Sequence, residues 1–136
     1  MLFSLDNDDL FKDYFNLERE VLSPEEGLIM GNLFLDEYVP YKNYKPYKVN
    51  PTNTEEALMM KIRSLCFAID DLNLKLDLEP NNKMLYDLFK KYNEKLKVLV
   101  KEYQDKYQTL TIEDDIKGRY TWYMGPWPWE GDRKNV

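Results

Sequence analysis

The chain has 136 residues, no histidine, a single cysteine (Cys66) and a formal net charge of -6. The lack of histidine excludes Ser–His and Cys–His nucleophile systems and histidine-containing metal sites, and a single thiol excludes an internal disulfide. Because nonspecific binding to a phosphate backbone needs a cationic face and a membrane span needs ~20 apolar residues in a row, neither nucleic acid nor a membrane is an expected partner.

Residues 1–22 form an acidic first region, and a helix is predicted over about residues 5–22. Its apolar residues recur at helical spacing, at Leu10, Tyr14, Leu17 and Val21. Three aspartates stand at its start, where they favour the positive end of a helix dipole. This helix is one candidate to cover the apolar faces of the helices that follow.

Residues 23–53 make up a second region, which is rich in proline and tyrosine. Ser23 is a good N-cap and Pro24 suits the first helical position, so a helix of a turn or two is predicted there. Beyond Gly31, three prolines disfavour regular helix. Four tyrosines recur at every third position, which would align them along one edge of a polyproline II helix: Tyr38, Tyr41, Tyr44 and Tyr47. This arm either wraps the protein's own helices or docks on a partner.

The third region, residues 54–136, begins with two predicted helices. The first covers about residues 54–77, with Thr54 as its cap and apolar residues in steps of four and three. A turn with Pro80 and an asparagine cap leads to a second periodic run over about residues 83–107. Each helix would be about 36 Å long, and the short link favours an antiparallel hairpin. The predicted fold class is all-α, a two-helix hairpin with extended arms.

Cys66 lies off the apolar seam of this predicted hairpin. A free cysteine is usually a small buried hydrophobe, and burial is the preferred interpretation. A reactive thiol is the alternative, but the adjacent residues Leu65 and Phe67 supply no cation to lower the pKa of the thiol.

The last part of the chain has no helical periodicity and holds all three tryptophans: Trp122, Trp127 and Trp129. Prolines alternate with the last two, which excludes a helix and would suit only the edge of a sheet. So much apolar surface must be covered, either by the hairpin itself or by a partner, since tryptophan dominates the energetics of interfaces.

Enzymatic chemistry would have to rely on carboxylates. Asp70 with Asp71, and residues 113–115, could in principle bind a hard cation, but neither cluster has the ligand spacing of a known loop. The five glycines form no phosphate-binding loop. The sequence therefore predicts no catalytic residue, no cofactor and no metal site.

The third region resembles the bacterial endospore coat protein CotJB family over about residues 55–131. The residues that carry the resemblance are Ile69-Asp70-Asp71-Leu72-Asn73-Leu74-Lys75-Leu76-Asp77, Pro80, Glu102-Tyr103-Gln104-Asp105-Lys106-Tyr107 and Pro126-Trp127-Pro128-Trp129-Glu130. Residues 23–48 resemble the companion coat protein CotJA, through Glu25-Glu26-Gly27-Leu28, Gly31-Asn32-Leu33-Phe34 and Pro40-Tyr41. The chain thus looks like a CotJB module with a CotJA-like segment fused ahead of it.

The resemblance implies a non-enzymatic structural protein that is made in the mother-cell cytoplasm and assembled into the endospore coat. It implies CotJA-like proteins and CotJC, which is similar to manganese catalases, as partners; a homo-oligomer is left open. The alternative is a soluble adaptor or chaperone of the manganese-catalase-like partner. The residues expected to bind partners are Trp122, Trp127, Trp129, Tyr38, Tyr41, Tyr44, Tyr47 and Phe34.

Overall fold

The structure is a computed structural model of the chain, and it describes residues 21–37, 39, 42–43, 45–114, 118, 120, 122–124, 127 and 129. These residues contain three α-helices and no strand, which agrees with the predicted all-α class. The helices are α2 (Pro24–Met30), α3 (Thr54–Leu78) and α4 (Lys83–Lys106), and three short 3-10 helices accompany them: η1 (Leu35–Glu37), η2 (Ile112–Asp114) and η3 (Trp122–Met124). All but the last two residues of the helix predicted over residues 5–22 lie outside the described residues. No helix in the described part is long and apolar enough to cross a membrane.

Helix α2 is short because its ends are fixed by strong local signals. The Glu26 N–H donates to Ser23 Oγ over 3.2 Å, and the Ser23 N–H donates to Glu26 Oε2 over 3.0 Å, which is a reciprocal capping box. Pro24 occupies the first helical position. Gly31 ends the helix with a positive φ of 75°, a left-handed conformation that glycine adopts without steric cost.

Asparagines cap both long helices. Asn53, and not the predicted Thr54, is the N-cap of α3, because its Oδ1 accepts the Glu56 N–H over 2.8 Å. Asn82 caps α4 and accepts the Leu85 N–H over 3.2 Å. At their C-terminal ends, α3 extends one residue further and α4 stops one residue earlier than the sequence predicts.

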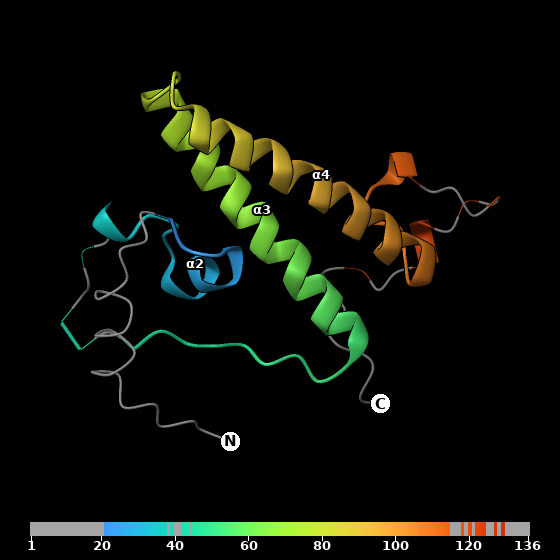
Figure 1. Cartoon of the computed structure of the whole chain (residues 1–136). Coiled ribbons are helices and arrows are strands. Elements are labelled where there is room, and N and C mark those ends of the chain that lie inside the picture. Colours follow the sequence, from blue (N-terminus) through green and yellow to red (C-terminus); the bar gives the residue numbers. More distant parts are fainter. Residues whose placement is uncertain are drawn as a thin grey trace.

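Helices α3 and α4 pack against each other along their length (Figure 1). The hydroxyl of Tyr103, near the end of α4, donates to Glu55 Oε1, in the first turn of α3, over 3.0 Å. The hydroxyls of Thr54 and Tyr107 lie 3.3 Å apart at the same end. Because the start of one helix thus meets the end of the other, the two run antiparallel.

A third layer covers α3 near the turn that joins it to α4. The segment around α2 contributes the first four of the seven buried members of the main core cluster, which are Leu22, Met30, Leu33, Phe34, Ala68, Leu72 and Leu85. Two backbone groups of Leu33 fix this layer: its N–H donates to Asp71 Oδ2 over 2.8 Å, and its carbonyl accepts the Leu22 N–H over 2.9 Å. The first part of the proline- and tyrosine-rich region is therefore part of the core.

Candidate functional site

Two of the carboxylates that the sequence singled out have structural partners. Asp71 accepts the Leu33 N–H, and Asp114 accepts the Thr111 hydroxyl over 2.7 Å in the turn at η2. Asp70 is exposed. The described residues hold no group of three or more histidine, cysteine, aspartate or glutamate side chains that could bind a metal ion.

Cys66 is exposed, so the prediction of a buried thiol is wrong. Nearby residues of α3 such as Ile62, Leu65 and Ala68 are buried, but the side chain of Cys66 is exposed. Partial desolvation, and to a lesser degree the charge of Asp70, raise the pKa of this thiol. A raised pKa keeps the less nucleophilic protonated form at neutral pH, which disfavours a catalytic role.

Beyond residue 119, the described residues place six apolar or aromatic side chains at the surface. We call this set the aromatic tail: Tyr120, Trp122, Tyr123, Met124, Trp127 and Trp129. The rings of Trp127 and Trp129 stack with centroids 5.3 Å apart and planes 6° apart, and those of Tyr120 and Tyr123 stack at 6.0 Å and 21°. Trp129 is 78% exposed, while Trp122 and Trp127 are 36% and 37% exposed. The tail therefore presents stacked rings to the surroundings.

A buried amide fixes the point at which the chain leaves α4 towards the tail. Gln104 is buried, and its Oε1 accepts the Leu110 N–H over 2.9 Å. The rings of Tyr103 and Tyr107, which precede and follow Gln104 in the sequence, lie 5.1 Å apart. Burial of Tyr103, and then its hydrogen bond to Glu55, raise its pKa to about 12. The chain just after α4 is thus held against the end of the helix pair at Leu110, although the rings of the aromatic tail lie at the surface.

The second predicted docking element is the tyrosine-rich arm, of which the structure describes residues 45–51 without a gap. These residues follow an extended path that passes beneath α2 to the start of α3 (Figure 1). Tyr47 is 80% exposed. Tyr38, Tyr41 and Tyr44 lie outside the described residues, so the alignment of four tyrosines along one edge stays a prediction.

Phe34 does not belong to this surface, although the sequence predicts it as a partner-binding residue. It is only 5% exposed and lies in the main core cluster, where Lys75 Nζ is 5.4 Å from the centroid of its ring. The bend after Asn32, whose Oδ1 accepts the Phe34 N–H over 2.8 Å, helps to direct the ring inward. We therefore leave Phe34 out of the docking surface.

Sequence reasoning missed four exposed apolar residues on both sides of the α3–α4 turn: Leu74, Leu78, Met84 and Tyr86. The exposure of Leu74 and Leu78 could have been predicted from the sequence, because neither residue falls in the apolar stripe that contains Leu72 and Leu76. These four residues lie near the turn between α3 and α4, far from the end of α4 at which the chain continues towards the aromatic tail.

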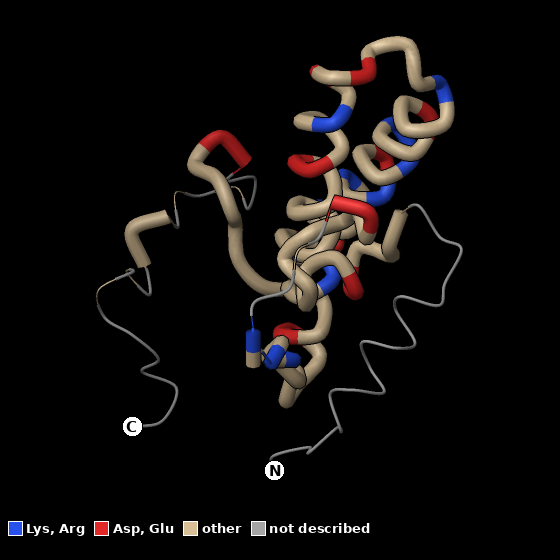
Figure 2. Tube along the Cα trace, turned by 90° about the vertical axis from the view of Figure 1, so that its left-hand side faces the viewer, with Lys and Arg blue, Asp and Glu red and all other residues tan. Residues whose placement is uncertain are grey.

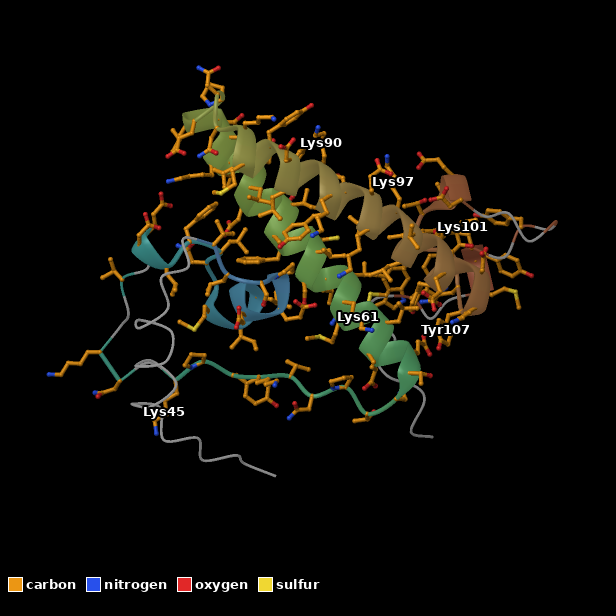
Figure 3. The ribbon with its side chains drawn as sticks, in the orientation of Figure 1. Lys45, Lys61, Lys90, Lys97, Lys101 and Tyr107 are labelled. Atoms are coloured by element: carbon orange, nitrogen blue, oxygen red, sulfur yellow. The ribbon has the colours of Figure 1, made fainter. Side chains whose placement is uncertain are left out.

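The outer side of α4 carries charged side chains, which form ion pairs with one another along the same helix. Figure 2 shows basic and acidic residues interleaved along the two long helices, and Figure 3 labels Lys90, Lys97 and Lys101 along α4. These three lysines pair with carboxylates of their own helix at 3.3, 3.2 and 2.7 Å. Because such exposed pairs leave the side solvated and alternating in sign, the aromatic segments are the better candidates for a docking surface.

Comparisons with known proteins give one positive finding. Neither the comparison with curated proteins nor that with solved structures gave a match. The family model described as CotJB protein matches residues 56–130, which run from the first turn of α3 into the aromatic tail and make up more than half of the chain. The chain therefore belongs to the CotJB family, which is associated with the bacterial spore coat.

Proposed function

We propose that this protein is a non-enzymatic structural protein of the bacterial spore coat, which joins neighbouring coat proteins through its aromatic segments. The observation that carries the proposal is the aromatic tail, in which Trp129 is 78% exposed and stacks on Trp127, within the part of the chain that matches the family. Tryptophan is among the residues that contribute most to the affinity of protein interfaces. A tail of this composition therefore suits contact with another protein better than contact with water.

The helical core suits the same role. Helices α3 and α4 are long, capped and packed against each other, and Gln104 fixes the chain at Leu110, so they provide a rigid base ahead of the tail. The partners that we propose are the ones expected from the resemblance, CotJA-like proteins and the manganese-catalase-like CotJC. The protein would be made in the mother-cell cytoplasm and then deposited in the coat.

A further part of the proposal concerns the segment of residues 23–48, which resembles CotJA. Its first half supplies Met30, Leu33 and Phe34 to a core that also contains Ala68, Leu72 and Leu85 of the CotJB-like helices. This packing supports the view that the segment takes, within one chain, the place of a separate companion protein. A CotJB-family protein without such a segment would then bind CotJA on the same face of α3.

The test is a double substitution, Trp127→Ala with Trp129→Ala. We expect the helical circular dichroism signal to be kept, because neither ring belongs to the main core cluster, and co-purification with the CotJC-like or CotJA-like partner to be lost. Tyr86→Ala, which also removes an exposed ring, is the matched control and should leave partner binding unchanged. A loss of helical signal would assign the tail to the core, and unchanged partner binding would remove the tail from the docking surface.

The mass of the co-purified complex separates two roles. A discrete, closed complex of fixed stoichiometry would favour the alternative, a soluble adaptor or chaperone of the manganese-catalase-like enzyme. An open or insoluble assembly would favour the structural role.

A further inference from the structure

Residues 21–37 form a compact loop that is closed by its own backbone, and we call it the docked loop. At its base Val21 pairs with Phe34 in an antiparallel bridge, and the Leu22 N–H donates to the Leu33 carbonyl over 2.9 Å. Between these ends lie the capping box and the glycine terminus of α2. Because the two ends meet and the turns are closed by internal hydrogen bonds, the docked loop has the form of a preorganised ligand.

Apolar contacts seat the docked loop on one face of α3. Gly27 lets the backbone of α2 come close to this face, since a Cβ at that position would lie 3.4 Å from Phe67 Cε1 of α3. The buried side chains that meet in the main core cluster are Leu22, Met30, Leu33 and Phe34 of the docked loop, Ala68 and Leu72 of α3, and Leu85 of α4. The face thus provides an apolar floor that the docked loop covers.

Two polar side chains of α3, one helical turn apart, fix the orientation of the docked loop. Asp71 Oδ2 accepts the Leu33 N–H over 2.8 Å. Lys75 forms an ion pair with Glu37, and its Nζ lies 5.4 Å from the centroid of the Phe34 ring. An apolar floor with a few polar groups that fix orientation is the usual composition of a binding site.

The covalent connection between the docked loop and α3 adds little to this contact. Residues 45–51 of the arm follow an extended path, and no hydrogen bond joins them to the other described residues (Figure 1). Six of these seven residues are exposed, and only Pro46 is half-buried. Such a connection acts as a tether, which raises the local concentration of the docked loop near its site without supplying specificity.

We propose that this face of α3 is a peptide-binding site, and that the docked loop fills it as a tethered ligand that binds even without the covalent connection. The ligand of this site is a compact apolar loop in which a Leu-Phe pair is followed three positions later by an acid, as in Leu33-Phe34 and Glu37. The family match begins at residue 56, so it includes Asp71 and Lys75 but not the docked loop. The inference deepens the proposal that this segment replaces a companion protein, and it rests on that proposal.

The experiment cuts the arm of the full chain after the protein has folded, at a protease site inserted after Val49. The two pieces should stay together in size-exclusion chromatography at micromolar concentration. Fluorescence anisotropy then measures the binding of a labelled peptide of residues 20–38 to the cut protein. The uncut chain is the control, because its own loop is present at an effective concentration of about 1 mM, and it should bind the peptide about a hundredfold more weakly.

A pair of substitutions in the cut protein tests the polar contact. Asp71→Ala should weaken peptide binding by about tenfold or more, because the Leu33 N–H loses its charged acceptor, whereas Asp70→Ala, at an exposed neighbour, should leave binding unchanged. Circular dichroism verifies that both variants keep their helices.

Three results would each overturn the peptide-binding site. They are separation of the cut pieces at micromolar concentration, equal binding of the peptide to cut and uncut protein, and equal effects of Asp71→Ala and Asp70→Ala. The first two need no substitution in the site, so they decide the matter even if a variant fails to fold. The proposed coat function is tested separately, by partner co-purification with the tail variant, so the two failures are distinguishable.

Discussion

The substitution Leu33→Ala tests whether the segment around α2 is part of the folded core. Leu33 is fully buried, at 0% exposure, between α2 and α3. A Cβ placed on Gly27 would lie 2.9 Å from Leu33 Cδ1, which shows how closely this side chain packs on the backbone of α2. Removal of the isobutyl group therefore opens a cavity that the capped helix has little freedom to fill, and we expect a loss of about 3 kcal/mol in the free energy of unfolding, within the range for buried leucines.

Urea unfolding followed by circular dichroism measures this loss. With a slope of about 2 kcal/mol per molar urea, the midpoint should fall by about 1.5 M. Leu74→Ala is the matched control, because Leu74 lies on α3 and is 63% exposed, and its free energy of unfolding should change by less than about 0.5 kcal/mol. If Leu33→Ala unfolds like this control, residues 22–34 are not part of the stable core in solution, and the proposal that they replace a companion protein fails.

Two further predictions concern polar contacts between distant parts of the chain. Asp71→Ala should lower the free energy of unfolding by about 1.5–3 kcal/mol, because it leaves the Leu33 N–H without its charged acceptor, whereas the exposed neighbour Asp70→Ala should have little effect in the same urea assay; equal effects would refute a specific role for Asp71. Because the pKa of Tyr103 is raised from 10.0 to about 12, its neutral form stabilises the fold fully below pH 10, and this contribution is lost as the pH rises from 10 to 12. Thermal unfolding should show that Tyr103→Phe has a smaller drop in melting temperature over this interval than the wild type, and an identical drop would contradict the assignment.

The long helices could be predicted from the sequence because their determinants are local. Apolar spacing, Pro80 and the asparagine before α4 define where each helix begins and ends, and the structure differs by one residue at two ends. The short helix α2 was predictable for the same reason, since Ser23 and Pro24 are adjacent in sequence.

What could not be predicted is which side chains the third layer covers. Phe34 and Tyr47 both stand in a proline- and tyrosine-rich region, yet Phe34 is buried and Tyr47 is exposed. The difference arises from the contact between Leu33 and Asp71, which are 38 positions apart, and no local pattern encodes such a distant hydrogen bond. Cys66 shows the opposite error. The sequence predicts that this small apolar residue is buried, but in the structure it is exposed.

The same reasoning applies to the tail and to the arm. Local sequence shows that both are aromatic and that neither can be a regular helix, but it cannot show whether a ring is covered by its own chain. The structure leaves Tyr47 and Trp129 largely exposed, although folding normally removes such apolar surface from water. Exposed aromatic surface of this kind is expected to be covered by another protein, and the double substitution Trp127→Ala with Trp129→Ala tests whether the tail provides that contact.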